Sequence, residues 1–347
     1  MITFFNAIHH THHGREEMFR GRMVPCHEVP ARVDGVLARL RARDLGPVHS
    51  PAHAPTMEAL ARVHDLRYLA FLQSAWSDWV ALDPENVGRD ALPSVWPNHG
   101  LRNDVLPTNF AARLGRYAFD SGTPLTAGSW DAACRGAACA LEAAATVRSG
   151  ARAAFALSRP PGHHAGTDFM GGYCFLNNAA LAAQALRDAG CARVAVLDVD
   201  YHHGNGTQQI FYGRGDVFFA SIHGDPMTEY PFFLGHADET GEGEGAGCNL
   251  NLPLPKGTGF GVWREALGVA LRRIAAYKAD ALVVSLGLDT FVGDPISGFT
   301  LEGADFLRVG EHLAGAGLPT VLVFEGGYAV EALAVNAVNV LEGFGGK

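Results

Sequence analysis

The chain lacks the features that mark several common protein classes. Its six cysteines are scattered and include no C-x-x-C pair, which in a chain of 347 residues indicates reduced thiols in a cytoplasm and not a disulfide framework. Charged residues make up only 18% of the sequence, so the chain is not disordered. No apolar run reaches roughly 18 residues, and the N-terminus has neither the basic nor the long apolar region of a signal peptide. We therefore expect a cytoplasmic protein that does not enter a membrane.

Three common catalytic motifs are also missing. The sequence contains no G-x-S-x-G, no H-E-x-x-H and no Walker loop, which argues against a serine hydrolase, a zincin and a nucleotide hydrolase. The net charge is −9, from 36 acidic and 27 basic residues. This balance argues against nucleic acid as the main partner and mildly favours cationic small molecules.

What the sequence does contain is an alternation of strand-like and helix-like segments. This alternation predicts parallel βαβ units in one open sheet, an α/β fold, and we expect one domain over residues 1–347. The predicted strands are 151–158, 193–199, 216–223, 280–287 and 318–325. The predicted helices are 29–41, 57–74, 129–148, 178–189, 259–277, 303–314 and 330–343. Residues 76–125 have weak periodicity and are expected to form long loops.

Polar side chains follow the predicted strand at 193–199. Residues two apart on an extended chain point the same way, so Asp198, Asp200 and His202 project to one side where this strand ends. Two carboxylates and an imidazole are costly to bury together unless something binds them, and a divalent metal is the obvious candidate.

A further aspartate, Asp289, follows the predicted strand at 280–287. Ligands of open α/β sheets bind outside the carboxyl ends of the strands, so Asp289 is expected to join Asp200 and His202. These three ligands leave positions open for water and substrate, as in a catalytic metal site. Zinc, iron(II), cobalt and manganese all fit this oxygen-rich set. The alternative is that the two aspartates only cap turns.

Two adjacent histidines and one tyrosine are expected at the same edge. His163 is predicted to bond Asp198, which favours the charged imidazole, and His164 to bond neutral Asn205, which leaves its pKa closer to the usual value. His164 could then act as general base and then as general acid. Tyr328 follows two glycines that allow a tight turn, and its phenol could stabilise an oxyanion beside a metal. Surface histidines and a tyrosine packed at a helix start are the alternatives.

Other polar residues predict less. Asn177 and Asn178 are expected to cap a helix, and Cys174 is expected to pack in the core. A dense group of N-terminal histidines is expected to lie in a solvated loop, with adventitious metal binding as the alternative: His9, His10, His12 and His13.

At this point the sequence resembles the histone deacetylase superfamily, and within it the bacterial acetylpolyamine amidohydrolases. The resemblance rests on segments that occur in the family's order: R-P-P-G-H-H-A at 159–165, G-G-Y-C-F-L-N-N at 171–178, D-V-D-Y-H-H-G-N-G at 198–206, S-L-G-L-D at 285–289 and E-G-G-Y at 325–328. The narrower match is supported by T-Q-Q-I-F-Y at 207–212, S-I-H-G-D-P at 221–226 and D-P-I-S at 294–297.

The resemblance implies an arginase–deacetylase fold with one sheet of about eight parallel strands flanked by helices. It implies a zinc-dependent deacetylase of small N-acylated amines, a homodimer in which long loops narrow the active-site entrance. The family's site residues would then fall on zinc ligands Asp200, His202 and Asp289, paired histidines His163 and His164, and transition-state tyrosine Tyr328. The substrate tunnel would fall on Tyr173, Tyr230 and the backbone of Gly172. Structural potassium ions would be bound at Asp198, Asp200, His202, Ser221 and Ile222, and near Phe211, Arg214 and Val217.

The chain departs from its polyamine-selective relatives in two places. Those relatives carry acidic residues in a loop that aligns with 109–111, where this chain has Asn109, Phe110 and Ala111, so a distal ammonium loses a carboxylate partner. Arg20 and Arg22 near the entrance would repel polycations. Acidic residues at the presumed rim would compensate in part: Glu229, Asp238 and Glu239.

Three alternatives to an acetylpolyamine substrate follow from the same scaffold. One is deacetylation of acetyl-lysine or hydrolysis of another small or xenobiotic amide. Another is a ureohydrolase of the arginase type, which needs two manganese ions and more aspartate ligands. The third is a non-catalytic acyl-lysine binder, which would be expected to lack Tyr328 or a metal ligand, whereas this chain has them all.

Overall fold

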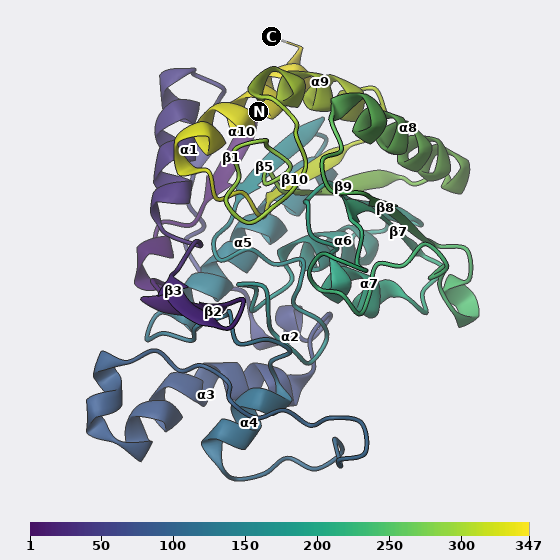
Figure 1. Cartoon of the computed structure of the whole chain (residues 1–347). Coiled ribbons are helices and arrows are strands. Elements are labelled where there is room, and N and C mark those ends of the chain that lie inside the picture. Colours follow the sequence, from purple (N-terminus) through teal and green to yellow (C-terminus); the bar gives the residue numbers. More distant parts are fainter. Residues whose placement is uncertain (347) are drawn as a thin grey trace.

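Eight short strands form one parallel sheet at the centre of the molecule (Figure 1). The computed structural model describes residues 1–346, and within them the sheet order is β4-β1-β5-β10-β9-β6-β7-β8. The strands are β1 (Ile2–Phe5), β4 (Val48–His49), β5 (Ala153–Leu157), β6 (Val194–Asp198), β7 (Val217–Gly224), β8 (Asn249–Leu254), β9 (Ala281–Leu286) and β10 (Thr320–Phe324). A separate antiparallel hairpin joins β2 (Glu16–Phe19) to β3 (Arg22–Pro25). The predicted open α/β sheet is confirmed.

Successive residues of the central strands bury alternate faces of the sheet. Val194 and Val196 of β6 pack into one core cluster, and Ala195 and Leu197 pack into the other. Both faces are therefore covered, which explains why these strands read as continuous apolar runs.

Helices form a layer on each face of the sheet. One layer consists of α5 (Ser129–Arg148) and α6 (Asn178–Asp188), and the other of α1 (Ala31–Ala42), α8 (Phe260–Tyr277), α9 (Gly303–Ala314) and α10 (Val330–Gly345). α3 (Leu66–Leu82) contributes to the same core cluster as α5 and α6 but lies further from the sheet. Shorter elements are α2 (Met57–Leu60), α4 (Phe110–Arg116), α7 (Asn205–Phe211), η1 (His9–Thr11), η2 (Pro84–Gly88) and η3 (Gly243–Gly245). No helix among residues 1–346 is both long enough and apolar enough to span a bilayer.

The predicted helix at 57–74 is wrong, because two helices occupy this region. The side chain of Asp65 accepts a hydrogen bond from the backbone N–H of Arg67 at 2.7 Å and so begins a new helix, α3. The expectation of long loops over 76–125 is also partly wrong, since α3 continues to Leu82 and α4 lies at Phe110–Arg116. Five strands were not predicted: β1 and β4 are short strands at one end of the sheet, β2 and β3 form the separate hairpin, and the edge strand β8 alternates asparagine and leucine and contains a proline.

Candidate active site

The predicted metal ligands meet at the carboxyl ends of β6 and β9. Ligand atoms of Asp200, His202 and Asp289 all lie within 4.8 Å of one another, and all three residues are buried. Nδ1 of His202 is 2.9 Å from Oδ2 of Asp289 and 3.4 Å from Oδ1 of Asp200. Because β6 and β9 are neighbouring parallel strands, with Asp198 paired to Ser285, the two loops that carry these ligands leave the sheet side by side.

Close approach of the backbone to Asp200 explains a glycine in the loop after β10. The N–H of Gly326 donates to Oδ2 of Asp200 at 2.8 Å, and a Cβ at this position would lie only 2.5 Å from the same oxygen. Any larger residue at position 326 would displace the carboxylate, so this loop and the ligand are fitted to each other.

The chemistry of this cluster fits a divalent cation. Burial and the neighbouring Asp200 raise the pKa of Asp289 to about 7, because two carboxylates this close resist ionising together. A bound cation removes that penalty, and one imidazole with two carboxylates is a ligand set that zinc and iron(II) accept. The three residues therefore fit the metal that the sequence predicts.

His163 and His164 lie beside this cluster and make the two predicted hydrogen bonds. Nδ1 of His163 is 2.9 Å from Oδ2 of Asp198, and Nδ1 of His164 is 2.6 Å from Oδ1 of Asn205. The two ring centroids are 4.0 Å apart. Burial opposes charge on His163, yet Asp200 and Asp198 raise its pKa to about 10.

The prediction that His164 has a nearly ordinary pKa is wrong. Complete burial, and then the positive charges of His163 and His202, lower the pKa of His164 well below its usual value. The effect of its neutral partner Asn205 is smaller than the cost of desolvation. His164 is therefore the neutral member of the pair.

Glu325, which was not among the predicted site residues, holds the histidine loop in place. Its Oε2 accepts the backbone N–H groups of Gly162 and His163 at 2.6 and 3.2 Å. Burial raises the pKa of Glu325 to about 7. This carboxylate connects the loop after β5 to the loop after β10, so the paired histidines and Tyr328 share one support.

Tyr328 lies on the same edge of the sheet and is 9% exposed. Its backbone N–H donates to Oδ2 of Asp294 at 2.7 Å, and its ring meets that of Tyr173 edge-on at 5.5 Å. Burial raises the pKa of the Tyr328 phenol well above its usual value, with Asp200 and Asp289 adding to the effect. The phenol therefore stays protonated and can donate a hydrogen bond.

Beneath Tyr328 is a buried ion network that sequence reasoning missed. The guanidinium carbon of Arg32 lies 4.8 Å from the centre of the Tyr328 ring, and its Nε donates to the carbonyl of Gly327. Oε1 of Glu28 accepts from Arg32 and Arg159 at 2.7 and 2.8 Å. Arg32, itself held by Glu28, therefore supports the turn at Gly327 and Tyr328.

The N-terminal histidines are not all in a solvated loop, so that prediction is wrong for two of them. His9 and His12 are 2% and 3% exposed. Their carbonyl groups accept the guanidinium of Arg159, and Nδ1 of His12 bonds Oγ of Ser129 at 2.9 Å. The segment is drawn inward because a buried arginine needs these acceptors.

The predicted tunnel tyrosines lie beside the predicted catalytic residues, Tyr230 against His164 and Tyr173 against Tyr328. Tyr230 lies edge-on to His164 at 5.1 Å and stacks on Phe119 at 5.7 Å. Gly172 and Tyr173 both have positive φ angles, 53° and 66°, which aim the loop at the site.

Each of these two tyrosines donates a hydrogen bond from its hydroxyl to a carboxyl group that sequence reasoning did not identify. The hydroxyl of Tyr230 donates to Asp120 at 2.7 Å, and that of Tyr173 donates to Glu17 at 2.9 Å. Oδ2 of Asp120 also accepts the N–H of Gly172 at 2.7 Å. A carboxyl group thus lies behind each of the two tyrosine rings.

The residues predicted to bind potassium lie in two groups. The first group lies at the adjoining ends of β6 and β7, where Asp198 pairs with Ser221. Its members are Asp198, Asp200, His202, Ser221 and Ile222. The other group, Phe211, Arg214 and Val217, lies where α7 leads into β7, and the N–H of Arg214 donates to the Phe211 carbonyl at 2.9 Å. Their binding of potassium stays a prediction.

Two residues of the non-acidic segment at 109–111, and Glu239 of the presumed acidic rim, have structural roles. Asn109 caps α4 through its side chain, and Phe110 is buried against Phe71 and Trp79. Glu239 accepts hydrogen bonds from Gln208 and from the N–H of Gly235 at 2.6 and 2.9 Å, so it holds its own loop together.

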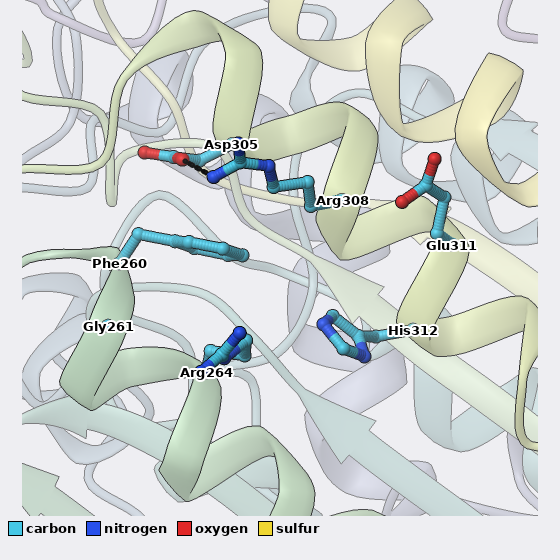
Figure 2. A pocket seen from close by; sticks show the side chains of 7 residues that line it. All are labelled: Phe260, Gly261, Arg264, Asp305, Arg308, Glu311 and His312. Atoms are coloured by element: carbon cyan, nitrogen blue, oxygen red, sulfur yellow. Dashed lines mark hydrogen bonds and ion pairs between the residues drawn. The ribbon is translucent and has the colours of Figure 1, made fainter.

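A hollow of about 520 Å³ lies away from this chemistry, between α8 and α9. Figure 2 shows Phe260 and Arg264 of α8 facing Arg308 and His312 of α9 across it. None of the predicted catalytic or metal-binding residues lines this hollow, so it is not the candidate active site.

Three candidate metal ligands and a pair of histidines thus lie together, buried, at the carboxyl edge of a parallel α/β sheet. The sequence profile of the histone deacetylase domain matches residues 26–344, and the chain belongs to the histone deacetylase family.

Similar proteins narrow the comparison. Acetylpolyamine amidohydrolase 1 of Pseudomonas aeruginosa is 55% identical over 347 residues, which is 100% of this chain and 99% of the relative. Acetylpolyamine amidohydrolase of Mycoplana ramosa is 45% identical over 346 residues, 100% of both chains. The crystal structure of an acetylpolyamine aminohydrolase from Burkholderia pseudomallei superposes with a TM-score of 0.94 at 44% identity, covering 99% of this chain and 98% of that one. The expected arginase–deacetylase fold is confirmed.

Proposed function

We propose that this chain is a zinc-dependent amidohydrolase that removes acetyl groups from small N-acetylated amines such as acetylpolyamines. The observation that carries the proposal is the meeting of Asp200, His202 and Asp289 within 4.8 Å of one another. Full-length relatives named as acetylpolyamine amidohydrolases, at 45–55% identity, support the substrate class. The net charge of −9 suits cationic substrates.

A zinc ion held by Asp200, His202 and Asp289 would polarise the amide carbonyl and make water nucleophilic at neutral pH. The proton transfers belong to the side chains. Nδ1 of His164 faces the side-chain oxygen Oδ1 of Asn205, which only accepts hydrogen bonds, so Nδ1 carries a hydrogen and Nε2 is free to accept a proton. His164 takes this proton from the attacking water and then gives it to the leaving amine.

Tyr328 is the group that stabilises the negative charge developing on the substrate oxygen. Tyr328 keeps its proton and donates a hydrogen bond to the oxyanion as the carbonyl carbon becomes tetrahedral. His163, held in its charged form by Asp198 and Asp200, orients its neighbour and supplies positive charge.

The tunnel supports a small cationic substrate. Tyr173 and Tyr230 offer aromatic faces to the methylene chain and to an ammonium group. Asp120 and Glu17, hydrogen-bonded to their hydroxyls, make the walls attractive to positive charge. We also propose that structural potassium ions bind at the two groups described above, that the protein is a homodimer and that it is cytoplasmic.

A substrate panel tests it. Zinc-loaded protein is assayed on acetylputrescine, acetylspermidine, an acetyl-lysine peptide and an uncharged N-acetyl alkylamine. We expect the acetylated diamine or polyamine to give the highest kcat/KM. A higher value for the peptide or for the neutral amide would assign the chain to the alternative substrates, and no hydrolysis of any of the four would reject the deacetylase.

A further inference from the structure

A second group of metal-ligand side chains lies outside the catalytic cluster. His9 and His10 belong to η1, and Asp34 belongs to the first turn of α1. Nε2 of His9 is 3.4 Å from Oδ1 of Asp34, and Nε2 of His10 is 3.1 Å from Oδ2 of the same carboxylate. One carboxylate therefore faces two imidazoles, one with each oxygen.

These separations agree with a common metal centre. Ligand atoms that lie about 2.0–2.1 Å from a tetrahedral zinc ion are ~3.3 Å from one another. Nε2 of His9 lies 3.4 Å from one oxygen of Asp34 and Nε2 of His10 lies 3.1 Å from the other, and each of these distances is close to this edge length. The two rings are also adjacent, with centroids 3.9 Å apart, and one ligand atom of each of the three residues lies within 4.8 Å of the other two.

One ring nitrogen of the buried member of the group has no partner within the described part of the chain. His9 is 2% exposed, and its Nδ1 is buried with no hydrogen-bond partner among residues 1–346. The polar contact of the His9 ring is the one between its Nε2 and Asp34.

We propose that His9, His10 and Asp34 form a second site for a divalent cation of the zinc type, separate from the catalytic cluster. The bound ion fastens η1, which follows β1, to the start of α1. His10 and Asp34 are 60% and 49% exposed at their side chains, so the site fills from solvent and keeps coordination positions for water.

The position gives the site a structural consequence. The carbonyl of His9 accepts Arg159, and Arg32, two residues before Asp34, lies under the ring of Tyr328. A cation at this site therefore stiffens the outer end of the network that supports Tyr328. The inference does not depend on the deacetylase assignment.

Calorimetric titration tests the site. Full-length protein that carries one tightly bound zinc per chain is titrated with Zn²⁺. We expect one further binding event per chain in the wild-type protein, weakened at least about 10-fold in His10→Ala and in Asp34→Asn. The matched control is His13→Ala, an exposed histidine of the same segment, which should keep the wild-type affinity.

A second readout avoids dependence on heats alone. Added Zn²⁺ should raise the unfolding temperature of the wild-type protein and of His13→Ala, and should not raise that of Asp34→Asn. Because His10 and Asp34 are exposed, both variants should fold normally, as circular dichroism will show. Absence of a second binding event in the wild-type protein overturns the proposal, and so does an event of unchanged affinity in both variants.

Discussion

Removing one oxygen atom from Tyr328 tests its assignment as the oxyanion donor. Tyr328→Phe keeps the ring, so the edge-on contact with Tyr173 at 5.5 Å and the stacking of Arg32 at 4.8 Å remain. The backbone bond from residue 328 to Asp294 also remains. The metal ligands are untouched, and the loss of one hydroxyl should change the free energy of unfolding by no more than about 1.5 kcal/mol.

The effect on catalysis should be much larger. Loss of one donor to a developing oxyanion costs about 10²–10³-fold in kcat, or about 2.7–4 kcal/mol of transition-state stabilisation. Since the bond strengthens only as charge develops, KM should change little. Steady-state assays on acetylputrescine, with zinc content and unfolding temperature measured in parallel, separate these effects. Tyr277→Phe is the matched control, because it removes a hydroxyl that donates to Gly215 outside the site. A kcat for Tyr328→Phe within about threefold of the control would refute the assignment.

Three further predictions address the groups around the site. In Asn205→Asp, a carboxylate replaces the amide at Nδ1 of His164 and raises the pKa of that imidazole. The low-pH limb of the kcat/KM profile should therefore move to higher pH. An unchanged pH profile would count against the pairing of His164 with residue 205. Asp120→Asn removes the carboxylate behind Tyr230, so the KM for acetylputrescine should rise about 10-fold, equivalent to about 1.4 kcal/mol. The KM for an uncharged N-acetyl alkylamine should not change. Equal changes for both substrates would argue against an electrostatic role of Asp120. Glu28→Gln leaves Arg32 and Arg159 without their carboxylate and should lower the free energy of unfolding by about 3–5 kcal/mol in urea titrations, whereas the exposed Glu16→Gln should not. Burial opposes ionisation of Glu28, but Arg159 and Arg32 lower its folded-state pKa to about 2 from 4.5. The stabilisation of the folded state by Glu28 is therefore present above pH 4.5 and is lost as the pH falls toward 2. A free energy of unfolding that stays constant between pH 4.5 and 2 would contradict the ion network.

Local sequence was sufficient to place the residues that follow the central strands. Asp198, Asp200 and Asp289 come directly after apolar runs, and parallel strands bring their carboxyl ends to one edge whatever the loops do. The same reasoning reached the bonds from His163 to Asp198 and from His164 to Asn205, because partners of matching chemistry were available at that edge.

Contacts between distant parts of the chain could not be predicted in the same way. Glu17 reaches Tyr173 across 156 residues, and Arg32 reaches Gly327 across 295. No pattern in the β2–β3 hairpin or in α1 predicts these partners, because the contacts depend on how the hairpin and α1 pack against the loops that carry Tyr173 and Gly327. The low pKa of His164 was missed for a related reason, since the degree of burial is a property of the whole site. The break at Asp65 had a local signal, a capping aspartate before an apolar run, that was not used.

The central claim is that Asp200, His202 and Asp289 bind one catalytic metal ion. Crystals of the zinc-loaded protein, measured on both sides of the zinc absorption edge, test it directly. An anomalous peak should lie about 2.0–2.2 Å from one oxygen of each aspartate and from a nitrogen of His202. Density without a peak between these three side chains, or a pair of manganese ions bridged by the aspartates, would contradict the claim.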